Sequence, residues 1–212
     1  MLMKSSKTHV AKTLEASAPV MTARRTLLAA GAATTMAALV PGAVRAAAAE
    51  AQAQSGASGR SIVIFFSRTN HTATLAERAA QKLGCELLRL ELREPYAENY
   101  GDMTDIAREE KRSGKRREIS TAIPDLSAYD TVYLGSPYWW GGISVPVMTF
   151  LADHPLAGKR VKPFVVSASS GPSGAWADLR KACPDAKIEE GFHTTESSVE
   201  GSLDEFDAWL AK

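Results

Sequence analysis

The usual marks of a metalloenzyme, a hydrolase or a dinucleotide-binding enzyme are missing from this sequence. Only two cysteines and four histidines occur among the 212 residues, and the histidines are too scattered to match the spacing of metal ligands. Neither a G-x-S-x-G elbow nor a G-x-G-x-x-G fingerprint occurs. We therefore predict no metal site and no catalytic side chain, and a hydrolase has little support. Cys85 and Cys183 are expected to be buried free thiols rather than a disulfide.

A surplus of charge of either sign is also lacking, because 25 Lys and Arg residues stand against 24 Asp and Glu residues. Residues 1–46 hold six of the basic and one of the acidic residues, which leaves 19 against 23 and a net charge of −4 in the rest. A mildly acidic protein suits nucleic acid poorly, so we expect no nucleic-acid partner.

The first 46 residues have the pattern of a bacterial export signal. Arg24 and Arg25 precede an apolar, uncharged segment over 27–40, and Val44-Arg45-Ala46 follows as a cleavage signal. The paired arginines resemble the twin-arginine signal, although Ala23 stands where serine or threonine is usual. The apolar segment is short for a membrane span, so we expect a cleaved signal and no stable membrane anchor. We predict a signal peptide over 1–46, a disordered linker over 47–60, and a periplasmic or otherwise exported domain over 61–212.

A buried strand, a polar turn and a helix follow one another between Ile62 and Leu83. Five apolar residues, 62–66, predict a strand covered on both faces, and the period of Leu75, Ala76, Ala79 and Leu83 predicts a helix that ends at Gly84. The first N–H groups of a helix bind anions readily. The turn adds hydroxyls and an asparagine that tolerates positive φ, so it predicts a phosphate site, although ordinary helix capping explains the same residue types.

Strands and helices alternate along the remaining chain, which predicts a parallel sheet with helices on both faces. The strands at 131–135 and 164–168 are strongly apolar and those at 86–92 and near 187–192 are not, so we expect five strands in the order 2-1-3-4-5, with the weak ones at the edges. Ser202 and Glu205 predict a capping box for the last helix. The basic residues between 111 and 117 are interpreted as a solvated surface.

Two further turns follow strands of this sheet and would lie at the same edge as the phosphate turn. One carries Tyr138, Trp139 and Trp140 between glycines, and we expect this loop to stack against a flat ligand. The other, 169–174, is made of small residues that allow backbone to approach a ring closely. In the order 2-1-3-4-5 the turns after the first and third strands flank a crevice.

These three turns together resemble the flavodoxin-like FMN proteins, in particular bacterial members of the flavodoxin_4 type, over residues 61–211. The resemblance implies a flavodoxin-like three-layer α/β/α sandwich that binds FMN without a covalent bond. It implies a phosphate cradle and a ring-binding pair of loops, made respectively by Ser67, Thr69, Asn70, His71 and Thr72, and by Pro137, Tyr138, Trp139, Trp140, Gly141, Ser169, Ser170 and Gly171. The family usually has Gly-Asn where this chain has Asn70-His71, so the charge of His71 is a new influence on the phosphate.

The function expected from the resemblance is electron transfer or NAD(P)H-dependent reduction of a small acceptor such as a quinone. Its partners would be a redox protein or the small acceptor, with NAD(P)H visiting transiently and a homodimer as a candidate assembly. The alternative is a non-redox binding module that kept the fold and lost the flavin, and fold alone cannot choose between them.

Overall fold

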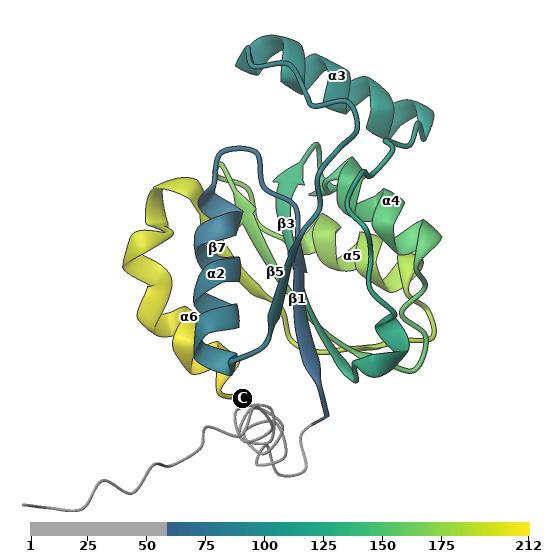
Figure 1. Ribbon diagram of the computed structural model, residues 1–212. Helices are drawn as coiled ribbons and strands as arrows, with labels where there is room; N and C mark the ends of the chain where they lie inside the picture. Colours follow the sequence, from purple (N-terminus) through teal and green to yellow (C-terminus); the bar gives the residue numbers. More distant parts are fainter. Residues whose placement is uncertain (1–58) are drawn as a thin grey trace, which may run out of the picture. The chain divides into compact units, whose positions relative to one another are not determined.

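A computed structural model describes residues 59–212 of the protein (Figure 1). The expected signal peptide and nearly all of the expected linker lie outside these residues. The strands of the described part are β1 (Ser61–Phe65), β2 (Glu86–Arg89), β3 (Thr131–Trp139), β4 (Gly142–Ile143), β5 (Arg160–Ser167), β6 (Lys187–Ile188) and β7 (Phe192–Thr195). Its helices are α2 (His71–Leu83), α3 (Tyr100–Ser113), α4 (Val145–Asp153), α5 (Ser173–Ala182) and α6 (Leu203–Leu210), with 3-10 turns at Leu126–Ala128, Glu196–Ser198 and Glu200–Ser202.

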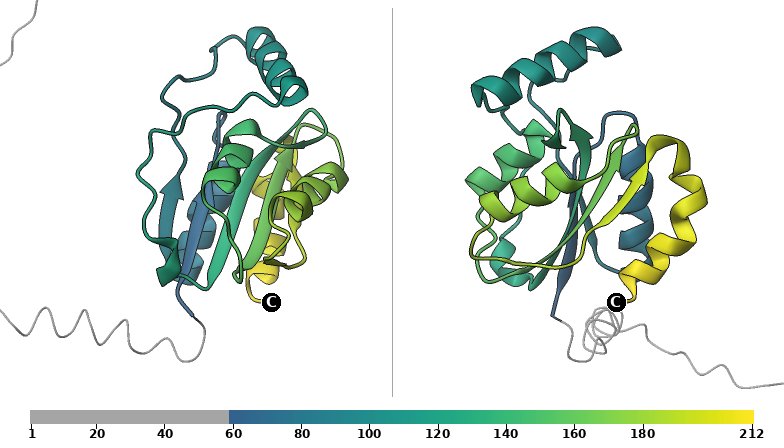
Figure 2. Two further views of the ribbon diagram at one scale, coloured as in Figure 1. Left: turned by 90° about the vertical axis from the view of Figure 1, so that its right-hand side faces the viewer. Right: turned by 180° about the vertical axis from the view of Figure 1, so that it is seen from behind.

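The α/β class and the parallel sheet predicted from the sequence are confirmed. The strands lie in the order β2-β1-β3-β5-β6, with β7 also paired to β5, and every pair is parallel except β3 with β4. Helices α2 and α6 cover one face and α4 and α5 the other (Figures 1 and 2). No helix of residues 59–212 is long and apolar enough to cross a membrane.

The predicted number of strands is wrong, because the sheet has seven strands rather than five. The chain turns back at Trp140 and Gly141, so that β4 pairs with the end of β3 where a loop was expected. The last expected strand is divided into β6 and β7, and between them Gly191 lies so close to the ring of Trp176 that a Cβ atom would overlap it.

Strand β1 is central because both of its faces are covered. Ile62 and Ile64 belong to one core with residues of α4 and α5, whereas Val63 and Phe65 belong to the other with residues of α2 and α6. Since successive side chains of a strand point to opposite faces, an uninterrupted apolar run is what a strand between two helical layers needs.

The ends of α2 are as the sequence predicts, whereas the start of α6 is not. Asn70 precedes α2 with φ 67°, and Gly84 ends it with φ 60°. No side-chain cap forms at Ser202, because its hydroxyl donates to the carbonyl of Val199 at 3.0 Å. The predicted capping box is therefore wrong, although the helix itself begins where expected.

Helix α3 lies apart from the two helical layers, above the carboxyl ends of the strands (Figures 1 and 2). Lys111 joins it to the sandwich, because its ammonium contacts Asp178 of α5 at 3.0 Å and the carbonyls of Trp139 and Ile143 at 3.3 and 3.2 Å. Arg117 pairs with the buried Glu110 at 2.8 Å. The interpretation of residues 111–117 as a solvated basic surface is thus wrong for Lys111 and Arg117, whose charges are paired inside the structure.

Candidate functional site

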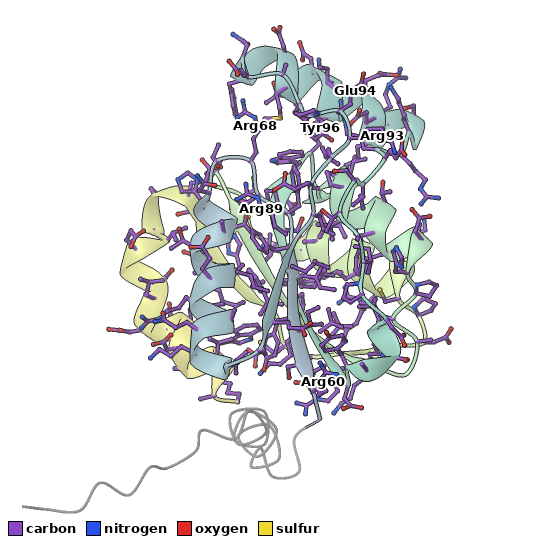
Figure 3. The ribbon with its side chains drawn as sticks, viewed as in Figure 1. Arg60, Arg68, Arg89, Arg93, Glu94 and Tyr96 are labelled. Carbon is purple, nitrogen blue, oxygen red and sulfur yellow. The ribbon has the colours of Figure 1, made fainter. Side chains whose placement is uncertain are left out.

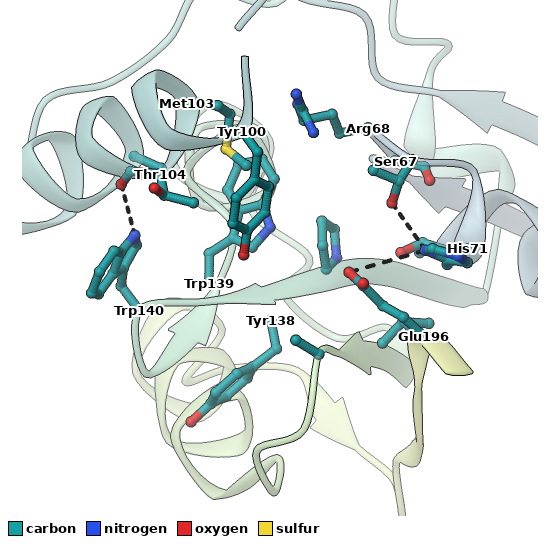
Figure 4. Close-up of a pocket in the computed structure, with 16 residues that line it drawn as sticks. Ser67, Arg68, His71, Tyr100, Met103, Thr104, Tyr138, Trp139, Trp140 and Glu196 are labelled. Atoms are coloured by element: carbon teal, nitrogen blue, oxygen red, sulfur yellow. Dashed lines mark hydrogen bonds and ion pairs between the residues drawn. The ribbon is translucent and has the colours of Figure 1, made fainter. Parts of the chain in front are cut away.

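A pocket opens between α3, the start of α2 and the β3–β4 hairpin, at the carboxyl ends of the central strands (Figure 4). Residues from all three predicted turns or their neighbours line it, together with Tyr100, Met103, Thr104 and Ala107 of α3. The charged groups of the lining, Arg68, His71 and Glu196, gather at one end (Figure 4). The other end is aromatic and uncharged.

The charged end is formed by the turn between β1 and α2. Ser67 is buried, and its hydroxyl oxygen accepts the N–H of Ala73 at 3.3 Å, which folds the turn over the first turn of the helix. The left-handed conformation of Asn70 directs the chain into α2, and the carbonyl of Asn70 accepts the N–H of Thr74 at 2.9 Å. The N–H groups of His71 and Thr72 begin the helix and have no acceptor within it, so they are available to an anion.

Two arginines that the sequence did not mark as site residues support this turn (Figure 3). Arg89, on the edge strand β2, donates to the carbonyl of Ser67 at 2.8 Å and lies 3.5 Å from the side-chain oxygen of Asn70. Arg68 donates to the carbonyls of Ala97 and Glu98 at 3.2 and 2.5 Å, which ties the turn to the chain entering α3. Both guanidinium groups place positive charge beside the turn.

His71 links the phosphate turn to a residue that is distant in sequence but lines the same pocket. Its Nδ1 lies 3.0 Å from the hydroxyl of Thr69 and 4.0 Å from a carboxylate oxygen of Glu196, in the 3-10 turn after β7. An anion bound at the turn would meet the Glu196 carboxylate, and a charged imidazole at His71 would lie between the two. Glu196 is far from the turn in sequence, and no motif marks it.

Three consecutive aromatic residues of the β3–β4 hairpin, Tyr138, Trp139 and Trp140, line the pocket. The two-residue turn of the hairpin has positive φ at both positions, 48° at Trp140 and 86° at Gly141, which is the backbone of the tight turns that join antiparallel strands. Gly174 of α5 lies against this turn so closely that a Cβ atom would overlap the carbonyl oxygen of Gly141. The hairpin is therefore held from behind by the start of α5.

Trp139 is partly buried between two other aromatic rings. Its ring meets Phe66 at 5.7 Å and Tyr96 at 5.2 Å between centroids, both edge to face. Such geometry is the favourable one for aromatic pairs. Trp139 therefore joins the core beneath the pocket while still lining it, whereas Trp140 is 49% exposed at the rim.

The loop after β5 contributes less to the pocket than the sequence suggests. The lining residues from this part of the chain are Val166, near the end of β5, and Ala168, just ahead of the predicted residues. Ser167 is buried and donates its hydroxyl hydrogen to the carbonyl of Ser170 at 2.6 Å, and the same oxygen lies 2.9 Å from Nε2 of His193. Because the hydroxyl hydrogen is used, the imidazole is the donor in the second contact. Burial lowers the pKa of His193, which favours the neutral ring.

Most of the predicted site residues meet at this pocket. Eight of the thirteen line it, namely Ser67, Thr69, His71, Thr72, Pro137, Tyr138, Trp139 and Trp140, and five do not, namely Asn70, Gly141, Ser169, Ser170 and Gly171. Asn70 and Gly141 instead shape the two turns through their positive φ. Sequence reasoning missed the contribution of α3 to the pocket, because its pocket residues have only a helical period and no motif, and it missed Arg89 and Glu196.

The donor set suits a phosphorylated, flat ligand. Free N–H groups at a helix start, hydroxyls and adjacent arginines match a phosphate, and the aromatic end matches a ring system. Among residues 59–212, no three His, Cys, Asp or Glu side chains gather as metal ligands do.

Comparisons with known proteins find one family and several solved structures that are similar to this chain. The model of a protein family described as Flavodoxin matches residues 60–212. A structure described as a flavoprotein, from Bacteroides uniformis, is 27% identical, with a TM-score of 0.64 over 73% of this chain and 99% of its own. Another from Bacteroides eggerthii is 28% identical, with a TM-score of 0.57 over 69% and 97%. A Lactobacillus acidophilus flavoprotein in complex with FMN shares the fold at 18% identity, with a TM-score of 0.57 over 70% and 99%. No curated protein matches the chain.

Proposed function

The chain belongs to the flavodoxin family, and from that membership we propose that it is an FMN oxidoreductase that reduces a small organic acceptor. The observation that carries the proposal is the division of one pocket into an end with hydroxyls, a helix start and charged side chains and an uncharged aromatic end. FMN has the same two parts, a phosphate and a flat ring system. Bound FMN supplies reversible two-electron redox chemistry.

The phosphate end would hold the cofactor through the β1–α2 turn. The hydroxyls of Thr69 and Thr72 and the N–H groups at the start of α2 would donate to the phosphate, and the helix dipole would favour its negative charge. Arg89 acts on the phosphate indirectly, because it holds the backbone of Ser67 and the side chain of Asn70 in place. A charged His71 offsets the repulsion between the phosphate and Glu196.

The hairpin would hold the ring system. Pro137, Tyr138 and Trp139 present apolar surface, and no lysine or arginine lines that end of the pocket. Surroundings of this kind stabilise negative charge poorly, since the lining is apolar and the cations beside the hairpin, Lys111 and Arg108, are already paired with aspartates. We therefore expect these residues to lower the reduction potential of the bound cofactor relative to free FMN.

A reductase is favoured over a pure electron carrier by charge. A carrier that docks on a basic partner protein gains from a strongly acidic surface, and the net charge of −4 outside residues 1–46 is a weak one. NAD(P)H would be the transient electron donor, since the chain lacks a dinucleotide fingerprint. Export by the twin-arginine route suits this function, because that route carries folded proteins with their cofactors bound.

The test is reduction and reoxidation of the full chain loaded with FMN. We expect flavin absorption bands that survive dialysis, bleaching by NADPH or NADH without oxygen, and rapid recovery with a quinone. Recovery with a protein acceptor but not with a quinone would assign the chain as a carrier. If the protein retains no FMN, the alternative function, a non-redox binding module, would be favoured instead.

Export is tested separately by replacing both arginines of the signal. Arg24→Lys with Arg25→Lys should leave the protein in the cytoplasmic fraction of a bacterial host, whereas the unchanged chain is recovered from the periplasm. Equal distribution of the two proteins would contradict the twin-arginine assignment.

A further inference from the structure

Two exposed aromatic side chains face the pocket from its uncharged end. Tyr100, in the first turn of α3, is 66% exposed, and Trp140, at the hairpin tip, is 49% exposed, and both line the pocket. Met103 and Thr104 of α3 line the wall with them (Figure 4). Exposed aromatic surface at a pocket wall is unfavourable in water and becomes favourable when a flat ligand covers it.

Trp140 has a backbone conformation that is unfavourable for a bulky residue. A φ of 48° suits glycine or asparagine, and a bulky residue there is a strained exception of the kind that gathers at functional sites. The side chain is nevertheless fixed, because its Nε1–H donates to the carbonyl of Thr104 at 2.9 Å and the guanidinium of Arg108 lies 5.0 Å from its ring. The indole therefore has a fixed orientation at the pocket rim.

The position of Tyr100 relative to this indole is fixed by contacts at both sides of it. Arg68 binds the carbonyls of Ala97 and Glu98 just before the helix, and Trp140 binds the carbonyl of Thr104 one turn into it. The two anchors bracket Tyr100. These contacts hold the backbone of Tyr100 at the pocket wall.

We propose that Tyr100 and Trp140 form the binding site for the electron acceptor, and that the acceptor is a planar, uncharged aromatic molecule of the quinone class. This inference rests on the proposed function, because it names the substrate of the same pocket. The charged lining groups, Arg68, His71 and Glu196, lie at the other end of the pocket. Arg108, beside Trp140, is paired with Asp105 at 2.7 Å, so the wall adds no net charge that would favour an ionic acceptor. Reduction balances as quinone, NAD(P)H and one solvent proton giving hydroquinone and NAD(P)+.

Binding can be measured without turnover, because an oxidised protein and a quinone do not react. We would dialyse duroquinone against the FMN-loaded full chain in the absence of a reductant. Its four methyl groups block addition to Cys85 and Cys183. Tyr100→Ala should weaken duroquinone binding about tenfold, as loss of an aromatic contact and its buried area predicts. Tyr100→Phe should bind within about threefold of the unchanged protein, because the ring is kept.

The matched control is Ile106→Ala, which removes another partly exposed apolar side chain of α3 that does not line the pocket. It should leave duroquinone binding unchanged. Trp140→Asn provides a second variant, since asparagine accepts positive φ, so the hairpin should fold while duroquinone binding falls.

The outcomes separate this inference from the proposed function. Suppose that the unchanged chain holds FMN and that Tyr100→Ala binds duroquinone as tightly as the unchanged chain. The proposed acceptor site is then wrong, whereas the proposal of an FMN protein is unaffected. Equal losses in Tyr100→Ala and Ile106→Ala would also overturn it, since they would reflect a general effect on α3. Failure of the unchanged chain to retain FMN would sink both.

Discussion

Replacement of Arg117 by methionine should destabilise the protein far more than replacement of any exposed arginine of α3. Glu110 is 3% exposed, and its carboxylate accepts one hydrogen bond from Arg117 Nε at 2.8 Å and another from the hydroxyl of Tyr96 at 2.7 Å. The Arg117 side chain is 12% exposed, and its guanidinium lies 3.9 Å from the ring of Tyr96. Arg117→Met removes the charge that neutralises a buried carboxylate and keeps the apolar stem.

The size of the effect follows from burial. Removing one partner of a buried ion pair costs about 3–5 kcal/mol, because the remaining charge stays desolvated and unpaired. Domains of this size have a free energy of unfolding of about 5–15 kcal/mol. The loss is therefore a large share of the total, and at about 2–4 °C per kcal/mol the melting temperature should fall by roughly 6–20 °C.

Arg112→Met is the control, because Arg112 lies in the last turn of α3, shortly before Arg117 in the chain. Arg112 pairs with Glu109 at 2.9 Å, but the two side chains are 75% and 59% exposed. An exposed pair three residues apart contributes about 0.5 kcal/mol or less. Urea unfolding of both variants with the unchanged protein measures the difference. If Arg117→Met lowers the free energy of unfolding no more than Arg112→Met does, the contacts of Glu110 with Arg117 and Tyr96 do not anchor α3, and our account of the α3 side of the pocket is wrong.

Three further substitutions test other contacts. Gly174→Ala should cost about 1–3 kcal/mol and weaken FMN binding, because the new Cβ overlaps the carbonyl of Gly141 behind the hairpin; urea unfolding with FMN titration measures both. Burial lowers the pKa of His193, so the unfolded chain binds its proton first and stability should fall as pH drops below about 6.5; His193→Gln should flatten that dependence in urea midpoints. The hydrogen bond from Arg78 lowers the pKa of Asp207 to about 2, so this stabilisation is present above about pH 3.8 and is lost as the pH falls through 2. Asp207→Asn should be less stable than the unchanged protein at neutral pH, and the difference in thermal melts should disappear below about pH 2.

The parts of the fold that the sequence predicts are those with a local signal. The run 62–66 has the uninterrupted apolar pattern of a strand covered on both faces, and Gly84 and Asn70 suit the ends of α2 by their tolerance of positive φ. The phosphate turn and the aromatic segment follow from such local patterns. Their meeting at one pocket follows from the parallel sheet.

The parts that the sequence does not predict depend on contacts between distant residues. Glu110 and Arg117 have the appearance of ordinary surface charges, and only the fold brings Tyr96 over them. The β3–β4 hairpin has Trp140 where turn rules favour asparagine or glycine, so the sequence predicts a loop here but not a tight two-residue turn. The place of Glu196 beside His71 depends on how the last strand ends.

The central claim is that this chain holds FMN by its phosphate in the β1–α2 turn, and one comparison of affinities tests it most directly. Dissociation constants of FMN and of riboflavin, which lacks the phosphate, would be measured on the full chain and on Thr69→Ala by titration of flavin fluorescence. We expect tight FMN binding, and we expect Thr69→Ala to weaken FMN about tenfold or more through loss of a charge-assisted hydrogen bond while leaving riboflavin unchanged. Absence of FMN binding, or equal weakening of both flavins, would contradict the account.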